Sequence, residues 1–261
     1  MSGFLPDVRI RGAYHVWRRD LQVYSKTWKM NILPNFFEPL IYLLGMGIGL
    51  GAWIRNDMGG MSYLAFITPG LIVTSAMNGA SFETTYNIFV KMHFGRTYHA
   101  ITSTPVNIED AMLGEVMWAM TRAMVYGVAF AIVVALFGLL PGLSGLALVP
   151  VLLLTSFVFA TVGLCFTSFI RVIDMYSFYY TLFLTPMFLF SGIFFPLSNL
   201  PDWVRIVAWI FPLTHAVNLA RGIIHGGVTP LSMAGEAAWL LILGLILLWI
   251  SLARIRRRYV L

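Results

Sequence analysis

Charged residues are scarce in this sequence of 261 residues, because Asp, Glu, Lys and Arg together make up only 11% of it. Ordinary soluble domains carry about 25% charged residues. Hydrophobic residues account for 59% of the chain, and the mean hydropathy is +0.82. These values exclude an ordinary soluble domain. They indicate an integral membrane protein that forms a single domain over residues 1–261.

Cysteine is almost absent as well, because Cys165 is the only cysteine in the chain. A single cysteine excludes a disulfide framework and a metal site built from cysteines. Cys165 lies in an apolar stretch, where we expect it to be a small core residue. The five histidines show no HExxH or similar metal-binding spacing, so we expect no metal site.

Motifs for nucleotide binding and for catalysis are also missing. The pattern GxxxxGK[ST], whose backbone cradles phosphates, does not occur at any of the three lysines, and no serine-nucleophile motif is present. We therefore expect neither a cofactor nor enzymatic activity in this chain. If ATP drives the protein, a partner chain must bind the ATP and its Mg²⁺.

Long apolar stretches are what the sequence does contain, and each is close to the roughly 20 residues that a helix needs to cross a bilayer. They predict an all-α membrane protein with six transmembrane helices. A shorter apolar run, Leu200–Phe211, is bracketed by prolines and predicts a re-entrant or interfacial helical segment within residues 196–230. The predicted spans are 31–54, 62–90, 108–138, 146–170, 175–195 and 232–253.

The segment 12–30 precedes the first span and has the pattern of an amphipathic helix. Its apolar face is rich in aromatic residues, and basic residues occupy the opposite face. Such a helix either lies in the membrane interface or packs on protein, and we favour the interface because of its tryptophans. The apolar face consists of Trp17, Leu21, Tyr24 and Trp28.

Basic residues determine the expected orientation of the chain. With six spans, both termini and the loop 91–107 lie on one side, which carries thirteen Lys and Arg residues against three on the other. Basic residues concentrate on the cytoplasmic side of membrane proteins, so we expect both termini in the cytoplasm. The same pattern accounts for the formal charge of +6, and we expect no binding of nucleic acid.

Four ionisable residues fall inside the predicted spans, where a charge costs about 2.5–3.5 kcal/mol and therefore needs a partner or water. The three carboxylates among them lie roughly 10 Å from the cytoplasmic ends of their spans. The long side chain of Arg122 could reach Glu115 or Glu83. A cluster of ion pairs that pins the helices, a gate or head-group contact, and a proton relay remain open, in that order of preference. The four residues are Glu38, Glu83, Glu115 and Arg122.

Aromatic side chains gather beside Glu83 in the lower half of the second span. Two interpretations remain open for them, ordinary helix packing or the wall of a route for an amphiphilic substrate. These candidates for the substrate path are Phe82, Tyr86 and Phe89. In the first span, Gly45 and Gly49 form a small-xxx-small pair, which predicts close packing by another helix.

Several stretches resemble the permease subunit of type-2 ABC exporters, and the resemblance covers nearly the whole chain. The stretches that carry it are EPLIYLLGMGIGLG (Glu38–Gly51), SAMNGASFETTYNIFVKMHFGRTYHAI (Ser75–Ile101), LGEVMWAMTRA (Leu113–Ala123), TPMFLFSGIFFPLSNLP (Thr185–Pro201) and FPLTHAVNLARGI (Phe211–Ile223). The resemblance implies a multi-pass permease of the bacterial inner membrane that forms a dimer, expected to be a homodimer, and binds a separate ABC ATPase subunit.

The resemblance also assigns parts of the chain. It implies that 12–30 is a connecting helix and that part of Lys91–Pro105 is a coupling helix, which sits in a cleft of the ATPase. It implies that the first, second and fifth spans line the path and that Leu197–Leu213 caps it from outside. The expected coupling residues are Lys91, Met92, His93, Phe94, Arg96, Thr97 and Tyr98.

The resemblance leaves the cargo open, because members of this family move lipo-chitooligosaccharides, other glycolipids, polysaccharides or drugs. We expect export of an amphiphilic glycolipid, lipo-oligosaccharide or polysaccharide, in contact with membrane lipids. A drug-efflux permease is the main alternative. An ion-coupled secondary transporter is a weaker one, because it requires an ion site near the middle of the membrane.

Overall fold

The described part of the chain is mainly helical, in agreement with the predicted all-α class. The computed structural model describes residues 8–49, 60–140 and 144–260, without the side chains of residues 29–36, 38–39, 46–48 and 259–260. Strands do not occur in these described ranges.

Short 3₁₀ and π-helical stretches, labelled η, occur between the α-helices. In chain order the elements are α1 (Ile10–Gly49), α2 (Tyr63–Phe82), η1 (Glu83–Asn87), α3 (Ile88–His93), α4 (Thr97–Thr102), α5 (Ile108–Leu136), α6 (Ser144–Ala147), α7 (Val149–Phe169), η2 (Ile173–Met175), α8 (Tyr176–Phe178), η3 (Tyr179–Leu184), α9 (Thr185–Phe190), η4 (Leu197–Asn199), α10 (Asp202–Ile210), α11 (Pro212–His225) and α12 (Pro230–Val260). Of these, η1 and η3 are π-helical, and η2 and η4 are 3₁₀ helices.

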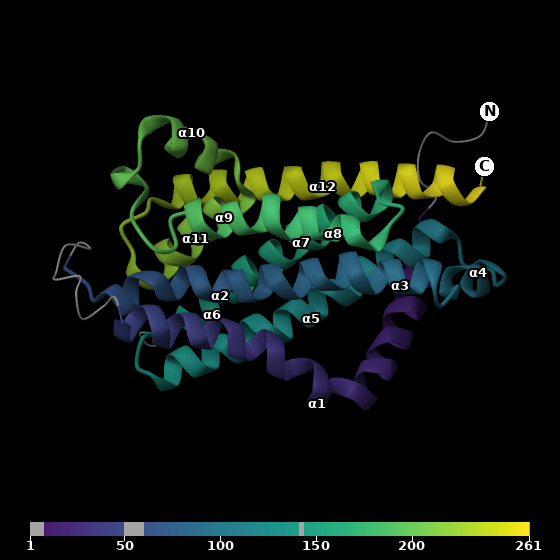
Figure 1. Cartoon of the computed structure of the whole chain (residues 1–261), viewed down its shortest axis with the longest axis horizontal. Helices are drawn as coiled ribbons and strands as arrows, with labels where there is room; N and C mark the ends of the chain where they lie inside the picture. Colours follow the sequence, from purple (N-terminus) through teal and green to yellow (C-terminus); the bar gives the residue numbers. More distant parts are fainter. Residues whose placement is uncertain (1–7, 50–59, 141–143, 261) are drawn as a thin grey trace.

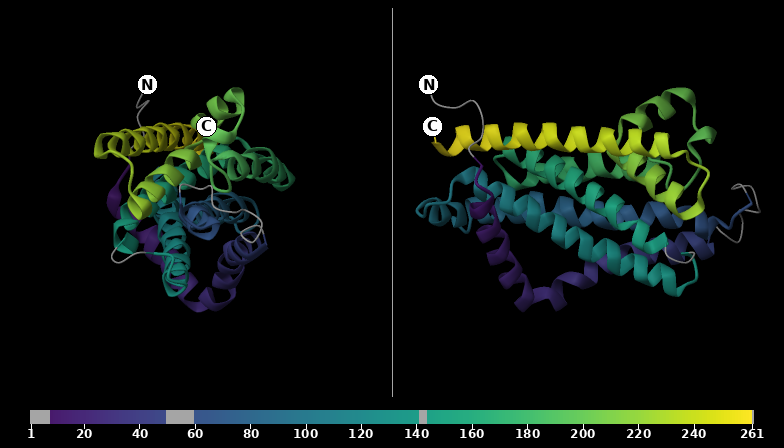
Figure 2. Two further views of the ribbon diagram at one scale, coloured as in Figure 1. Left: turned by 90° about the vertical axis from the view of Figure 1, so that its left-hand side faces the viewer. Right: turned by 180° about the vertical axis from the view of Figure 1, so that it is seen from behind.

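The long helices run side by side along the long axis of the molecule (Figure 1). One end, called the loop end below, holds α3, α4, the start of α1 and the last turns of α12. The opposite end, called the far end, holds α10 and the start of α2. The end view in Figure 2 places α12 and α1 on opposite sides of the bundle.

Helix α1 is one continuous helix of 40 residues, Ile10–Gly49, that bends midway (Figure 1). It contains both the predicted amphipathic helix 12–30 and most of the predicted first span, which the sequence pattern treats as two elements. The structure joins the two parts in one helix with a bend. Glycine is absent from residues 13–44, and a membrane helix tolerates the two prolines there, Pro34 and Pro39, as kinks.

Four helical runs in the described residues are long and apolar enough to cross a membrane. The pair α10 and α11 adds a fifth if it is one broken span, although its two helices meet at 89°. The predicted second, third, fourth and sixth spans correspond to Tyr63–His93, Ile108–Leu136, Gly145–Phe169 and Pro230–Arg258. The predicted fifth span contains the π-helical stretch η3 and begins at the last residue of η2, and a count of six spans stays a prediction.

The π-helical stretches η1 and η3 lie side by side in the bundle. The Ser81 hydroxyl lies 3.1 Å from the Tyr179 hydroxyl, and the Thr85 hydroxyl lies 3.1 Å from that of Tyr180. Irregular backbone at this depth needs partners for its carbonyls, because lipid offers none. The carbonyl of Thr84 finds one, since the Thr167 hydroxyl of α7 donates to it over 2.7 Å. Such π-helical stretches often mark functional sites in helices.

The first half of α1 packs on α5 through two close approaches. A Cβ atom at Gly114 would lie 2.6 Å from the carbonyl oxygen of Ala13, and one at Gly12 would lie 2.5 Å from Oδ2 of Asp110. Because both positions lack a side chain, the two backbones come close enough to bury Ala13 and Val16.

Candidate functional site: buried charges at the loop end

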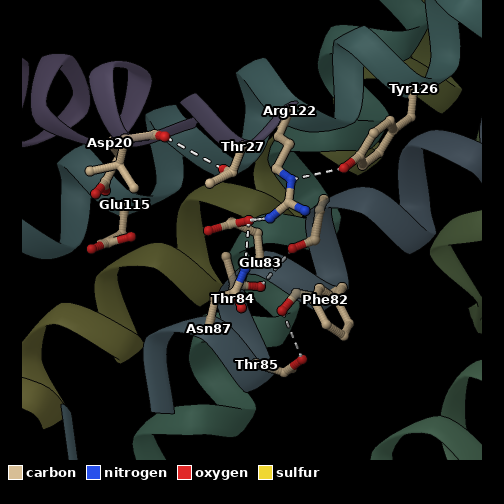
Figure 3. A network of polar contacts seen from close by, with 12 residues as sticks. Asp20, Thr27, Phe82, Glu83, Thr84, Thr85, Asn87, Glu115, Arg122 and Tyr126 are labelled. Atoms are coloured by element: carbon tan, nitrogen blue, oxygen red, sulfur yellow. Dashed lines mark hydrogen bonds and ion pairs between the residues drawn. The ribbon is translucent and has the colours of Figure 1, made fainter. Parts of the chain in front are cut away.

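The charge network at the loop end has two parts, and the first is an ion pair between α5 and η1. The Arg122 guanidinium contacts the Glu83 carboxylate, and both side chains are buried. Arg122 Nε also donates to the Tyr126 hydroxyl over 2.9 Å, and Asn87 Nδ2 donates to Glu83 over 2.9 Å (Figure 3). Of the two partners that the sequence allows for Arg122, the structure shows Glu83.

Aromatic rings enclose the Arg122 guanidinium. Its carbon lies 5.4 Å from the centre of the Tyr24 ring and 5.6 Å from the centre of the Tyr126 ring. The Tyr24 ring itself packs edge-on against Trp118 at 5.2 Å. Cation–π contacts of this kind strengthen when water is excluded. The ion pair therefore joins three elements, because Tyr24 belongs to α1.

The second part of the network centres on Lys91. Its Nζ lies 2.7 Å from Oε2 of Glu115 and 3.0 Å from Oδ2 of Asp20. The Tyr98 hydroxyl donates to the other oxygen of Glu115, Oε1, over 2.9 Å. Figure 3 shows the Asp20 and Glu115 carboxylates as neighbours. One ammonium group thus bridges two buried carboxylates and connects the end of α3 with α1 and α5.

Sequence reasoning missed Asp20 as a member of this network and treated Lys91 as a contact for a partner. A usable signal was present, because Asp20 is the only acidic residue between positions 12 and 30 and follows Ala13 and Val16 at helical spacing. A buried acid on the packed face of a basic helix needs a cation nearby. Glu38, the fourth predicted member, lies among the residues whose side chains the structure does not describe.

The predicted coupling residues divide into a buried and an exposed group. Tyr98 and Met92 are buried, and Lys91 is held in its ion pairs, so these side chains do not form an outward surface. Tyr98 faces the bundle, because α4 is a short helix that turns this ring onto α5, and its role in coupling stays a prediction. The more accessible residues are His93, Phe94, Arg96 and Thr97.

The turn between α3 and α4 is strained at Arg96. Its φ of 44° lies in the left-handed region, and no other non-glycine residue in the described ranges has a positive φ. That conformation costs an L-residue roughly 1–2 kcal/mol. Phe94 in the same turn is 71% exposed, an unusual position for a large apolar ring. The turn thus presents a rigid apolar and basic surface.

The three candidates for the substrate path have different surroundings. Phe89 is buried, with its ring 5.6 Å from Tyr176, which favours the packing interpretation for this residue. Tyr86 is half-buried and stacks on Tyr180 at 5.7 Å. The Phe82 side chain is 40% exposed on the surface of the bundle.

The residues of the apolar face predicted for the amphipathic helix also have different surroundings, because two contact protein and two are exposed. Trp17 donates from Nε1 to the Thr121 hydroxyl over 2.9 Å, and Tyr24 lies against Arg122. Leu21 and Trp28 are exposed. The helix therefore packs on protein along one face, while its place in a membrane interface stays a prediction.

Basic residues at the end of α12 contact three other elements at the loop end. Arg256 Nε lies 3.2 Å from Oε1 of Glu109 in the first turn of α5. Arg258 donates to the carbonyl of Ile170 over 3.0 Å and lies 3.1 Å from Nε2 of His93. The last helix thus holds the start of α5, the end of α7 and the end of α3 together.

Known proteins resemble this chain over most of its length. Residues 12–225 match the family described as ABC-2 type transporter. The chain belongs to this family. It is 38% identical to nodulation protein J of Rhizobium meliloti (strain 1021) over 244 residues, which cover 93% of this chain and 92% of the relative. Its several apolar helices make it a multi-pass membrane permease of the ABC exporter class.

Two further relatives show how far the similarity extends. Nodulation protein J of Rhizobium leguminosarum bv. trifolii is 39% identical over 211 residues, covering 81% of this chain and 80% of the relative. The inner membrane transport permease YadH of Escherichia coli (strain K12) is 25% identical over 203 residues, 78% of either chain.

Proposed function

We propose that this permease moves an amphiphilic glycolipid, lipo-oligosaccharide or polysaccharide out across the inner membrane, driven by a separate ABC ATPase subunit that binds ATP and Mg²⁺. The loop end and both termini face the cytoplasm in this proposal. The observation that carries it is the buried chain of contacts from Tyr98 through Glu115 and Lys91 to Asp20.

This chain of contacts supports a coupling role for α4. An ATPase that pushes on the exposed turn displaces α4, and Tyr98 transfers that displacement to Glu115 on α5. Lys91 holds the same carboxylate and Asp20, so α1 moves as well. Hydrogen bonds to charged groups are shorter and about twice as strong as neutral ones, and they strengthen further away from water. The contacts are therefore suited to transmit force between helices.

The same helical run continues this transfer into the membrane. Lys91 and Glu83 both lie in the run Tyr63–His93, separated by the π-helical stretch η1. Glu83 is paired with Arg122 on α5. A shift at Lys91 therefore reaches a second ion pair, two turns farther from the loop end.

The surface of α1 supports a second copy of the permease as partner. A Cβ atom at Gly45 or Gly49 would meet no described residue within 4 Å, so the described part of the chain does not supply the predicted close helix packing. The neighbouring Ile41 is exposed. A homodimer that packs along this part of α1 would use the two glycines and enclose a path between the copies.

Co-purification with the ATPase tests the proposal. The permease is expressed with the ATPase of the same operon, purified in mild detergent, and assayed for bound ATPase and for ATP-dependent movement of a glycolipid in proteoliposomes. Phe94→Ala should release the ATPase without changing the thermal stability of the permease. Leu231→Ala is the matched control, because Leu231 is 85% exposed at the far end.

Two results would contradict the proposal. One is a permease that purifies alone under conditions in which the ATPase itself is folded and abundant. The other is transport that continues without ATP and stops when the proton gradient is removed, which would favour an ion-coupled transporter. Stimulation of ATP hydrolysis by drugs but not by glycolipids would favour the drug-efflux alternative.

A further inference from the structure

A small cavity of about 150 Å³ lies between α1, α2 and the segment formed by η3 and α9. Its wall combines aromatic rings with polar side chains, unlike the apolar grooves elsewhere on the bundle. The residues on which the argument rests are Tyr42, Thr74, Asn78, Tyr180, Thr185 and Phe188. The cavity is thus built from three separate parts of the chain.

Asn78 is the unusual residue of this cavity. It is the central residue of the helical run Tyr63–His93, and it is half-buried. Its carboxamide, with two N–H donors and an acceptor oxygen, makes no hydrogen bond to any residue that the structure describes. An amide without partners costs several kcal/mol in hydrocarbon. Retaining one at mid-depth favours a partner outside the residues that the structure describes, such as a bound ligand.

Three other polar groups of the wall already have partners. The Thr74 hydroxyl donates to the carbonyl of Gly70 over 2.8 Å, and that of Thr185 donates to the carbonyl of Tyr180 over 2.9 Å. The Tyr180 hydroxyl is within 3.1 Å of Thr85. The remaining hydrogen-bonding capacity of the wall lies at Asn78 and at the hydroxyl of Tyr42, which makes no hydrogen bond to a described residue.

Aromatic rings form the opposite wall. The Tyr42 ring of α1 meets the Phe188 ring of α9 edge to face at 5.2 Å, and a third ring, Phe194, lies 5.0 Å from Phe188. A sugar ring can bind both parts of this wall. Its C–H face stacks on aromatic rings, and its hydroxyls both donate hydrogen bonds to a carboxamide and accept them from it. An acyl chain would leave the amide unpaired.

The surroundings argue against a charged or purely apolar ligand. Among the described residues, neither Lys nor Arg lines this cavity, and these residues offer no cation to a phosphate or carboxylate. A separate groove of about 450 Å³, lined by Tyr179 and Phe183 of the same π-helical stretch, is almost entirely apolar. The two sites differ in chemistry, and the cavity at Asn78 is the polar one.

We infer that the cavity at Asn78 binds one sugar ring of the transported amphiphile, with Asn78 as its hydroxyl-recognising residue. The inference rests on the proposed function, since it names the part of the substrate that this permease recognises. Pockets for whole small molecules measure about 300–1,000 Å³. A smaller cavity suits a single ring of a longer molecule that passes the site.

Binding to the permease alone, in lipid nanodiscs without ATPase, tests the inference. The probes are a dansyl-labelled alkyl glucoside and a dansyl-labelled polyoxyethylene ether with the same alkyl chain. Saturable energy transfer from tryptophan to dansyl gives the affinity of each. Asn78→Leu keeps the shape of the side chain and removes the amide. Thr155→Val is the matched control, because the Thr155 hydroxyl is bonded within its own helix, α7, and does not line the cavity.

Asn78→Leu should weaken glucoside binding about two- to tenfold, the range for one lost hydrogen bond, and leave ether binding unchanged. Thr155→Val should change the binding of neither probe. It should also raise the thermal midpoint, because the unpaired amide is gone. Phe188→Leu, a second variant that needs no change at Asn78, should weaken glucoside binding selectively as well. Equal loss of both probes, or no loss in either variant, would overturn the inference.

Failure of the proposed function would look different. ATP-dependent glycolipid movement is measured separately in proteoliposomes with the ATPase. Absent movement together with selective glucoside binding would reject the exporter proposal and leave the sugar site standing. Normal movement together with unselective binding would reject the sugar site alone.

Discussion

Tyr98 and Lys91 hold opposite oxygens of the same buried carboxylate, that of Glu115. The Tyr98 hydroxyl donates to Oε1 over 2.9 Å, and the Lys91 ammonium lies 2.7 Å from Oε2. The position of Glu115 on α5 therefore depends on two elements of the loop end at once. A substitution of either Tyr98 or Lys91 should therefore alter the contact that the other residue makes with Glu115.

Replacing Tyr98 by Phe removes the hydrogen bond and keeps the buried ring. Hydrogen bonds to charged groups contribute about 1.5–3 kcal/mol, so thermal unfolding in detergent should shift to lower temperature. The amount of substrate moved per ATP should fall as well. Thr102→Val serves as control, because the Thr102 hydroxyl bonds only to carbonyls of α4 itself. An unchanged transport ratio would contradict a coupling role for Tyr98.

Removing the cation at position 91 should be more severe. In Lys91→Met the carboxylates of Asp20 and Glu115 lose the ammonium that bridges them, and Asp20 keeps only the partly exposed Arg19 as a cation partner. Breaking a buried pair in this way costs about 3–5 kcal/mol. Lys91→Arg keeps the charge and should retain most of the stability. Adding Glu115→Gln to Lys91→Met should recover part of the loss in thermal unfolding. If Lys91→Met and Lys91→Arg unfolded at the same temperature, the charge at position 91 would not be the source of the stability.

The pair of Arg122 and Glu83 gives a test by double mutation. Arg122→Met and Glu83→Gln should each destabilise the protein, because each leaves one buried partner unpaired. The double variant should be clearly more stable than the sum of the single losses predicts. Denaturation in mixed micelles measures all four proteins. Additive losses would show that the two side chains are not coupled.

Arg96 allows backbone strain and side-chain recognition to be separated. Arg96→Gly relieves the left-handed strain and should raise stability, whereas Arg96→Ala keeps the strain and should leave stability nearly unchanged. Both remove the charge from the exposed turn, and both should lower ATPase-coupled transport. Normal transport in both variants would exclude a role for the arginine side chain.

The positions of most long helices in this fold were predictable, because the length of each apolar stretch in the sequence indicates a membrane-spanning helix. The helix α5 begins at Ile108, the start predicted for the third span, after Asn107 and with Glu109 and Asp110 in its first turn. Joining 12–30 with the first span was not predictable from hydropathy, since the two parts differ in composition while the backbone between them continues. The π-helical stretches left no trace in the sequence pattern, because they depend on partners from other helices.

The candidate site was predicted only in part. Depth in the membrane identified Glu83, Glu115 and Arg122 as residues that need partners. Which of them meet depends on the rotation of each helix, and that is decided by packing. Lys91 and Tyr98 looked like loop residues, and only the contact of α4 with α5 turns them inward.

The continuity of α1 has one more consequence. Asp20, which binds Lys91 at the loop end, and Tyr42, which forms a wall of the cavity at Asn78, belong to the same unbroken helix. The helix bends between these two residues and contains Pro34 and Pro39 there, so a displacement of its first half is expected to reach the Tyr42 ring as a change in the bend. The contacts proposed to respond to the ATPase and the cavity proposed to bind a sugar ring therefore lie along one helix.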